Sequence, residues 1–347
     1  MGKARVILVG SQNLGGLLDD GETMKNYMLA RELERHGCRV CRIDTRNRLK
    51  RVLYMIKYLY NLVVKRDSKI IMSASTFVAY KMFKIARCLG WKGNSLYYWV
   101  IGGAFGTKIE EKAIDKDVYL SLHKIIVEGT SMKKQLEQCG FNNVMVLPNF
   151  KDINYIPAVK AKQRDGITRF VFLSRVMPEK GVNYIVEATK LLINEGITSF
   201  KVDLYGTIDD AYHVVLNNAI NDIDIVNYKG FLKLNENGYD ALSSYDVMLF
   251  PTFWHGEGFP GIIIDAFVAG VPVIASDWNL NSSLIKNGED GIIIPAHSSE
   301  ALAKAMKDII MGKINLEEMS IKAHESCMNY DSKHVVTKEL LEELEIL

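Results

Sequence analysis

The sequence predicts an α/β protein built from two doubly wound domains, each with a parallel sheet, that face a central cleft. Its 347 residues exceed the length of one typical hydrophobic core. Short runs rich in Val, Ile and Leu alternate with helical patterns along the whole chain, as in parallel sheets covered on both faces. The polar stretch 151–166 separates two such series. We therefore expect one domain at residues 1–150 with a C-terminal helix at 331–347, and a second at residues 151–330.

In the first domain, each expected strand is a nearly continuous apolar run, and the helical patterns lie between these runs. We place the strands at residues 5–10, 38–44, 69–74, 95–102, 124–129 and 144–149. The helices are expected near residues 21–36, 48–64, 76–89, 110–122 and 131–139. A helix over residues 332–346 would be long enough to cross back over this domain.

The second domain repeats the alternation of apolar strands and helices. Its strands are expected at residues 169–175, 200–206, 225–231, 246–252, 271–277 and 291–295. Ligands of parallel sheets bind outside the carboxyl ends of the strands. Two such domains facing each other would therefore put both sets of strand ends around one cleft.

The composition is that of an ordinary globular protein, with 48% apolar and 24% charged residues. The five cysteines are odd in number and scattered, and the pair Cys38 and Cys41 has no second ligand pair. We therefore expect reduced thiols, no metal and no cofactor. Without an apolar leader or a long apolar run, we expect a cytoplasmic protein with no spanning helix.

The charge is divided unevenly between the two halves of the chain. The first 150 residues carry 25 Lys and Arg against 13 Asp and Glu, and the remainder carries 18 against 28. Residues 46–69 alone contain eight basic residues and one acid. One narrow stripe of the helix expected there holds Lys50, Tyr54, Lys57, Asn61 and Lys65.

This basic, aromatic helix has two interpretations. It is either a core helix with a solvated basic stripe, or an interfacial helix that lies against anionic lipid. We favour peripheral contact with the inner face of the membrane, through Lys50, Lys57 and Lys65. Nucleic acid is not an expected partner, because the sequence holds no recognised nucleic-acid motif and this region is rich in apolar residues.

The loop after the first strand is rich in glycine. The spacing of Gly10, Gly15 and Gly16 fits neither a Walker loop nor the dinucleotide fingerprint. The next glycine, Gly21, opens a helix, where the absence of a side chain would let the backbone come close to a ligand. A plain glycine turn explains the same residues equally well.

The second domain begins with a strand that ends at Arg175, and Lys180 follows five residues later at a helix start. A guanidinium fork and an ammonium at a strand's carboxyl end make a plausible clamp for a diphosphate.

The stretch "VMLFPTFWHGEGFPGIIIDAFVAG" has the same layout of strand, loop and helix. Pro260 suits the first helical position, so the backbone amides of Gly261, Ile262 and Ile263 would face an anion. Glu257 could accept hydrogen bonds from sugar hydroxyls, and Asp265 from a ribose diol. Two cations, a helix N-terminus and two acids together indicate a nucleotide diphosphate sugar. His255, beside them, is more typical of ordinary surface than of a catalyst.

At this point the chain resembles the retaining GT-B glycosyltransferases of family four over most of its length. "LSRVMPEKG" is similar to the family's G-R-x4-K-G element, and "EGFPGIIID" to its E-x7-E element. "GVPVIASD" and "NGEDGIIIP" follow in the expected order.

The resemblance implies a GT-B fold of two Rossmann-like domains and a site for a nucleotide sugar. The implied catalytic residues are Arg175 and Lys180 on the diphosphate and Glu257 on the donor sugar. Further implied donor contacts come from Gly21, Ser174, Gly258, Phe259, Pro260, Gly261, Ile262 and Asp265. It also implies a metal-independent transfer with retention, in which the donor's own phosphate takes the acceptor proton.

Three departures from the family pattern concern the site. Asp265 stands where the family usually has Glu, and Ser174 replaces the usual glycine. The stretch "WNLNSSLI" lacks the family's glycine pair and glutamate. A histidine carried by many members is not evident in "YYWVIGGAFG", although Gly102 and Gly103 keep a loop that would face the acceptor in the cleft.

The sequence therefore predicts a glycosyltransferase that moves a sugar from a nucleotide diphosphate sugar to a saccharide acceptor, with retention. A lipid-linked acceptor in bacterial surface polysaccharide assembly is our hypothesis, motivated by the basic, aromatic helices. The alternatives are a nucleotide-sugar epimerase of the same architecture, an NAD-dependent oxidoreductase, and a non-catalytic sugar-nucleotide binder. Product analysis without an acceptor would reveal the epimerase, and a nicotinamide absorbance change would reveal the oxidoreductase.

Overall fold

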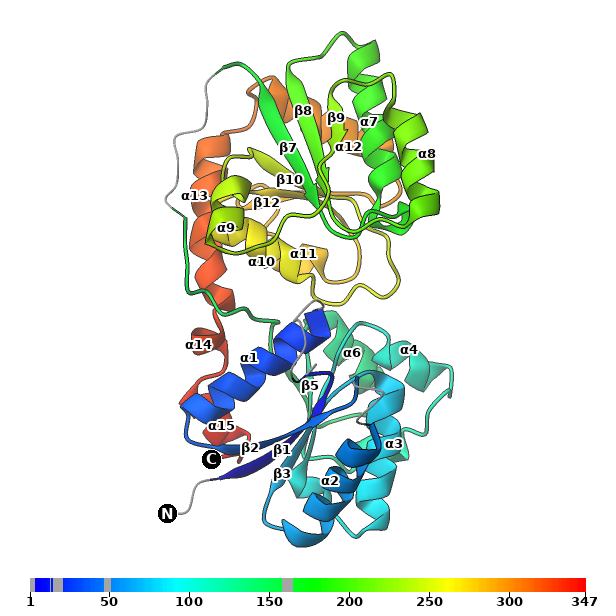
Figure 1. Cartoon of the computed structure of the whole chain (residues 1–347), viewed down its shortest axis with the longest axis vertical. Helices are drawn as coiled ribbons and strands as arrows, with labels where there is room; N and C mark the ends of the chain where they lie inside the picture. The colour runs from blue at the N-terminus through cyan, green and yellow to red at the C-terminus, as the bar shows by residue number, and fades with distance from the viewer. Residues whose placement is uncertain (1–3, 13, 15–20, 47–50, 158–164) are drawn as a thin grey trace. The chain divides into compact units, whose positions relative to one another are not determined.

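A computed structural model describes residues 4–12, 14, 21–46, 51–157 and 165–347. The chain forms two compact units, one of Met1–Asp152 with Tyr330–Leu347 and the other of Ile153–Asn329 (Figure 1). Both are α/β units with one six-stranded sheet each, as the alternation of strand and helix patterns predicts. Each unit is described in turn below.

The sheet of the first unit is parallel, with strand order β2-β1-β3-β4-β5-β6. Its strands are β1 (Arg5–Gly10), β2 (Arg39–Asp44), β3 (Lys69–Ser73), β4 (Leu96–Trp99), β5 (Lys124–Val127) and β6 (Val144–Val146). Ile7 of β1 stands opposite Cys41 on one side and Ile70 on the other. The next strand in the sequence, β2, lies on one side of β1, and β3 lies on the other side. The strand order therefore reverses at β1, and parallel sheets bind ligands at such a reversal.

The helices of the first unit differ from expectation in two places. They are α1 (Gly21–Arg35), α2 (Arg51–Val64), α3 (Thr76–Cys88), α4 (Phe105–Glu110), α5 (Asp117–Leu120), α6 (Thr130–Gln138), α14 (Ser332–Val335) and α15 (Lys338–Glu343). The helix expected near 110–122 is instead the short pair α4 and α5, with Lys112 in the left-handed conformation between them. The single C-terminal helix expected at 331–347 is also wrong, because Thr337 starts a new helix by accepting a hydrogen bond from the Leu340 amide.

The C-terminal segment packs on the first unit although it follows the second in the sequence. The Tyr97 hydroxyl on β4 donates a hydrogen bond to the Leu344 carbonyl at 2.6 Å. The Ser332 hydroxyl donates to the Glu32 carboxylate of α1 at 2.8 Å. Val335, Val336, Leu341, Leu344 and Ile346 lie in one buried cluster with residues of β1, β3 and β4. The segment thus closes one face of the first sheet.

The sheet of the second unit is also parallel, with strand order β12-β11-β10-β7-β8-β9. Its strands are β7 (Thr168–Leu173), β8 (Phe200–Tyr205), β9 (Val226–Tyr228), β10 (Val247–Phe250), β11 (Val273–Ser276) and β12 (Gly291–Ile294). Its helices are α7 (Val182–Asn194), α8 (Asp210–Ile220), α9 (Glu236–Leu242), α10 (Gly261–Val268), α11 (Asn281–Leu284), α12 (Ser299–Ile310) and α13 (Leu316–Ser326).

This second sheet has the strand order of a Rossmann-like fold. The chain runs outward from β7 through β8 to β9, then returns to place β10 on the other side of β7. Helices α7 and α12 pack on each other, and α10 packs against α9 and α13. The strand order therefore reverses between β7 and β10, and such folds bind nucleotides at a reversal of this kind.

The described ranges bear on three expectations, which concern the thiols, membrane-spanning helices and metal sites. All five cysteines lie in them, and none is in a disulfide. None of the helices in these ranges combines the length and the apolar character needed to cross a membrane. No group of three His, Cys, Asp or Glu side chains placed to hold a metal occurs in the same ranges.

Candidate functional site

The loops that follow β7 and β10 are tied together at the switch point of the second sheet. After β7 the chain makes the short 3-10 turn Pro178–Lys180, and after β10 it makes the loop 251–260. The Phe253 amide donates a hydrogen bond to the Glu179 carbonyl at 2.9 Å. The two segments therefore form one platform of backbone at the carboxyl ends of adjacent strands.

An ion pair between Lys180 and Glu257 lies across these two loops. The side chains are only 6% and 11% exposed. The Thr252 hydroxyl donates a second hydrogen bond to the same Glu257 oxygen at 3.1 Å. A lysine and a carboxylate removed from water must be paired and hydrogen-bonded, because the cost of desolvating each charge is several kcal/mol. The sequence predicts both residues at one site, and the structure brings them together.

Gly181, the residue after Lys180, has a backbone reason to be glycine. Its φ is +84°, in the left-handed region. A Cβ at this position would lie 2.1 Å from the Pro251 carbonyl oxygen. Only glycine lets the turn after β7 approach the loop after β10 this closely, so Gly181 sets the position of Lys180.

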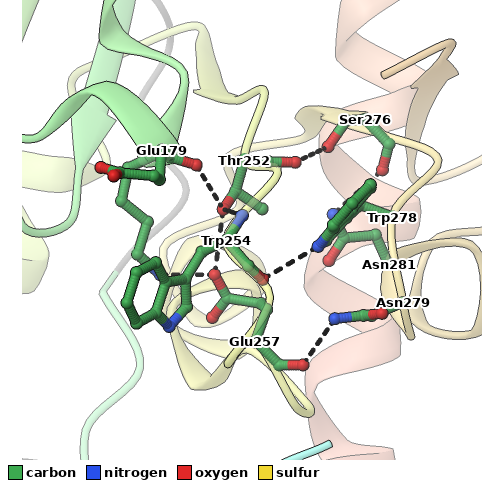
Figure 2. A network of polar contacts seen from close by, with 9 residues as sticks. Glu179, Thr252, Trp254, Glu257, Ser276, Trp278, Asn279 and Asn281 are labelled. Carbon is green, nitrogen blue, oxygen red and sulfur yellow. Dashed lines mark hydrogen bonds and ion pairs between the residues drawn. The ribbon is translucent and has the colours of Figure 1, made fainter. Parts of the chain in front are cut away.

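Side chains from the loop after β11 hold the backbone around Glu257 (Figure 2). The Trp278 indole N–H donates to the Trp254 carbonyl at 2.9 Å, and the Asn279 side-chain amide donates to the Glu257 carbonyl at 2.7 Å. The Ser276 hydroxyl donates to the Thr252 carbonyl at 2.5 Å. Ser276 is the last residue of β11, and Trp278 and Asn279 belong to the stretch where the family's glycine pair is missing. Sequence reasoning treated that stretch only as a departure, although its polar residues directly after a strand were a usable signal.

Arg175 lies near this network but does not share the burial of Lys180. It is exposed, and its guanidinium carbon lies 5.5 Å from the centre of the Trp254 ring. Such a cation–π contact holds the guanidinium while leaving its N–H groups open to an anion. The neighbouring Ser174 is half-buried, and its amide donates to the Tyr205 carbonyl at 3.1 Å, extending β7 by one residue.

The N-terminus of α10 differs slightly from the expected geometry. Pro260 is the N-cap residue rather than the first helical residue, and the helix begins at Gly261. The Ile263 amide donates to the Pro260 carbonyl at 3.1 Å, so it is not one of the open amides that we expected. Gly258 is half-buried, Phe259 is buried and Ile262 is half-buried.

Asp265, the second acid of the E-x7-E element, is buried inside the second unit. Its side chain accepts a hydrogen bond from the Tyr239 hydroxyl of α9 at 2.6 Å, and the residue is only 1% exposed. Burial, and then the charge of Asp265, raise the pKa of Tyr239. Tyr239 is a partner that sequence reasoning missed. The role of Asp265 on a ribose remains a prediction.

The candidates in the first unit are the loop glycines. Gly21 is exposed as the first residue of α1, and a Cβ there would meet nothing within 4 Å. Its own surroundings therefore do not require glycine. Gly102 has φ +77°, and with Gly103 it lies in the loop between β4 and α4. The acceptor-facing role of this loop remains a prediction.

A buried polar cluster at the ends of β1 and β5 in the same unit was missed from the sequence. The Lys25 ammonium of α1 lies 2.5 Å from the Glu128 carboxylate after β5, and both side chains are buried. Burial, opposed by a hydrogen bond from the Ser11 amide and reinforced by Asp44, raises the pKa of Glu22. Sequence reasoning weighed the glycines of this loop and overlooked the charged residues that follow them.

Helix α2 presents a different face to solvent than its charge pattern suggests. The Lys57 ammonium donates to the Arg42 carbonyl of β2 at 3.0 Å, and Asn61 is buried. The polar stripe therefore lies along the edge of the side that packs on the protein. The face opposite that packed side is exposed. It carries Val52, Leu53, Ile56, Leu59, Tyr60, Val63 and Val64, whose exposed fractions run from 38% to 71%. We call these seven residues the α2 apolar face. Lys50 lies outside the described residues.

Comparison with known proteins is consistent with this arrangement. Residues 167–311 match the family model "Glycosyl transferases group 1". The chain is 24% identical over 230 residues to the capsular polysaccharide biosynthesis glycosyltransferase CapM of Staphylococcus aureus, covering 63% of this chain and 57% of CapM. It is 27% identical over 191 residues to the Escherichia coli UDP-Gal:alpha-D-GlcNAc-diphosphoundecaprenol alpha-1,3-galactosyltransferase, covering 49% and 46%.

The chain thus spans about half the length of these curated relatives. Among solved structures, Anabaena HepE in complex with UDP superimposes with a TM-score of 0.69 at 16% identity, covering 99% of this chain and 100% of HepE. At 16% identity the match shows the fold alone. Residues 167–311 therefore carry a domain of the glycosyl transferases group 1 family, and the chain has the GT-B fold.

Proposed function

We propose that this protein transfers a sugar from a nucleotide diphosphate sugar to a saccharide acceptor in the assembly of a bacterial surface polysaccharide. The observation that carries the proposal is the Lys180–Glu257 pair, held at the switch point between β7 and β10. A cation for the leaving diphosphate and an acid for sugar hydroxyls stand there side by side. The names of the relatives from S. aureus and E. coli support the same class of reaction.

Lys180 and Arg175 are assigned to the diphosphate of the donor. Negative charge builds up on the leaving phosphate as the bond to the sugar breaks, so fixed cations lower the barrier. Lys180 supplies a buried ammonium, and Arg175 supplies an exposed guanidinium held over Trp254. The amides of Gly261 and Ile262 at the start of α10 would add partial positive charge on the same anion.

Glu257 is assigned to hydroxyls of the donor sugar, together with the backbone of Gly258 and Phe259. Its pairing with Lys180 balances the two charges, so that neither group is buried alone before the donor arrives. When the donor binds, its phosphate would also contact the Lys180 ammonium, and the sugar hydroxyls would donate hydrogen bonds to the Glu257 carboxylate in place of part of the ion pair. This exchange keeps every charge partnered throughout binding.

Retention of configuration without a metal completes the proposed mechanism. The acceptor would attack from the side on which the diphosphate leaves, and the phosphate oxygen would take the acceptor's proton. No side-chain base is needed for that step. The protein's part is then to orient both substrates and to stabilise the diphosphate.

We further propose that the first unit binds a lipid-linked acceptor and lies against the inner face of the membrane. The α2 apolar face carries seven apolar side chains that are exposed to solvent. Exposed Lys81, Lys84 and Arg87 lie on the neighbouring helix α3, which contacts α2 through the Tyr58 hydroxyl and the Met82 carbonyl. An apolar helix face beside basic residues fits the anionic surface of a bilayer. Lys57 and Lys65 would then lie beside the contact with lipid, and the α2 apolar face would form it.

The test of the proposed function is a transfer assay with the purified protein. The donors are UDP-, GDP- and ADP-sugars, and the acceptors are polyprenyl-diphosphate-linked mono- and disaccharides. The expected result is a lengthened lipid-linked saccharide with one donor, with the anomeric configuration of that donor kept in the product. An altered sugar nucleotide formed without any acceptor would instead identify an epimerase, and absence of both products would refute the proposal.

A further inference from the structure

Five aromatic side chains gather beside the loop of Glu257 in the second unit. We call them the aromatic platform, and they are Tyr184, Phe253, His255, Trp278 and His297. Trp254 adjoins the platform through its carbonyl, which Trp278 binds, while its ring lies beside Arg175. The centre of the His297 ring lies 4.6 Å from that of Phe253 and 5.7 Å from that of Trp278. The His255 ring lies 5.5 Å from Trp278. They come from α7 and from the loops after β10, β11 and β12.

The platform is held in place from several directions. The Trp278 indole N–H binds the Trp254 carbonyl, and the Phe253 amide binds the Glu179 carbonyl. The Tyr184 hydroxyl lies 3.2 Å from Nδ1 of His297. His297 itself has φ +60°, a left-handed conformation that is unfavourable for a residue other than glycine. The surrounding structure thus maintains a strained residue in order to present its ring here.

All five side chains are partly or fully exposed, whereas Phe83, Tyr98, Phe105 and Tyr119, which contact one another in the first unit, are fully buried. The contrast is clearest for tryptophan. Of the four in the chain, Trp91 and Trp99 are buried in the first unit, whereas Trp254 and Trp278 are half-buried here. Grouped aromatic rings left open to water mark a binding surface more often than a core.

We propose that the aromatic platform binds a pyranose ring of the saccharide substrate. The inference rests on the proposed function, because it extends the same site. A pyranose has a face of C–H groups and a rim of hydroxyls. The C–H face packs on the negative face of an aromatic ring, and the hydroxyls need polar partners at the edge. Trp278 supplies such a ring, and His255, His297 and Tyr184 supply polar atoms beside it.

The position of the platform favours a sugar over a nucleobase. Glu257, assigned to sugar hydroxyls, shares its loop with Trp254, and its carbonyl accepts a hydrogen bond from Asn279, the neighbour of Trp278. The platform therefore continues from the sugar end of the site toward the β11 and β12 edge of the sheet. Neighbouring rings in it are inclined by 50–90°, which forms a wall rather than the parallel slot that a flat base would fill.

The experiment is fluorine NMR of the full chain labelled with 5-fluorotryptophan. Its four tryptophans give four signals, assigned with Trp254→Phe and Trp278→Phe. The probes are the methyl glycosides of glucose, galactose, mannose and N-acetylglucosamine, with uridine and guanosine as nucleosides. We expect at least one methyl glycoside at millimolar concentration to move the signals of Trp254 and Trp278, while those of Trp91 and Trp99 stay fixed as internal controls of folding.

Two variants sharpen the result. Trp278→Ala is expected to weaken binding of the effective glycoside, followed at the Trp254 signal, by about tenfold, because it removes the ring on which the sugar would pack. His297→Asn keeps a residue that tolerates the left-handed backbone but removes the imidazole, and it is expected to weaken binding as well. Trp278→Phe keeps an aromatic face and is expected to bind better than Trp278→Ala.

Signals that move with nucleosides and not with glycosides would overturn the inference and make the platform a site for the base. Signals that move with neither probe would also overturn it. The outcome is separable from that of the transfer assay. If the protein transfers sugar but no glycoside moves either indole signal, the inference about the platform is wrong and the proposed function stands. If a glycoside binds at the platform but the protein transfers no sugar, the proposed function is wrong.

Discussion

The hydroxyl of Tyr239 donates a hydrogen bond to the carboxylate of Asp265 across 2.6 Å, and so joins α9 to α10. In the resemblance to family four, Asp265 is the shorter replacement of a glutamate. The hydrogen bond gives this shorter side chain a partner inside the second unit. The acid that we expected to reach a ribose therefore also fixes the helix whose N-terminus borders the site.

We predict that Tyr239→Phe destabilises the second unit by about 1–3 kcal/mol, because it removes a donor from a buried carboxylate. The matched control is Tyr228→Phe, whose hydroxyl donates to the neutral carbonyl of Gly206 at 2.8 Å. Its loss is expected to cost about 1 kcal/mol. Urea unfolding followed by fluorescence measures both. Equal losses for the two variants would mean that Asp265 does not depend on Tyr239.

Gly181→Ala is predicted to lower stability more than Gly196→Ala. Both glycines have left-handed backbones, with φ of +84° and +78°. A Cβ at Gly196 would meet nothing within 4 Å, so that variant is expected to cost only the conformational penalty of about 1–2 kcal/mol. A Cβ at Gly181 would also collide with the Pro251 carbonyl, adding about 1–3 kcal/mol. Equal shifts in the unfolding midpoint would contradict the close approach of the two loops.

The raised pKa of Glu22 predicts a pH dependence of stability in the first unit. A group whose folded pKa lies above its unfolded value adds stability below the unfolded pKa, and that contribution is lost as the pH rises through the folded pKa. Glu22→Gln keeps an acceptor for the Ser11 amide and cannot ionise. The variant is therefore expected to gain stability relative to wild type between pH 4 and pH 8. Urea unfolding at both pH values tests this, and an unchanged difference would show that Glu22 ionises without cost.

The α2 apolar face is predicted to carry the membrane contact. The double variant Ile56→Asp with Val63→Asp is expected to abolish co-sedimentation with vesicles of phosphatidylglycerol and phosphatidylethanolamine, since it places two charges where lipid would lie. Val214→Asp with Val215→Asp on α8 changes two similarly exposed residues of the second unit and is expected to leave sedimentation intact.

Charge reversal of Lys57 and Lys65 is expected to weaken vesicle binding less than the apolar variant and in a salt-dependent way. If the apolar double variant sediments like wild type while the charge reversal does not, the lysines form the contact and the apolar face does not.

The sequence predicted the strands well because a parallel strand buried on both faces must be apolar almost throughout. The breaks in the helices at Lys112 and before Thr337 depend on single backbone choices that the apolar pattern does not record. The helical periodicity of α2 predicted a polar stripe, but periodicity alone cannot show which side of the helix packs against a neighbouring strand.

At the site, Arg175, Lys180 and Glu257 were recoverable because their positions after strands follow from local pattern. The position of Trp278 and Asn279 after a strand was a usable signal, but their partners were not predictable, because the contacts join segments more than twenty residues apart in the sequence. The same holds for Tyr239, whose partner Asp265 lies on a different helix.

The central claim is that Lys180 holds the diphosphate of the donor. Calorimetric titration with UDP, GDP and ADP measures this directly in wild type, in Lys180→Met and in Lys307→Met. Lys307 pairs with Glu195 at 2.6 Å on the exposed surface of the same unit and serves as the matched control. We predict that one of these nucleotides binds wild type and Lys307→Met alike, and binds Lys180→Met at least about tenfold more weakly. Equal affinity for all three proteins, or no binding of any of the three nucleotides to wild type, would contradict the account.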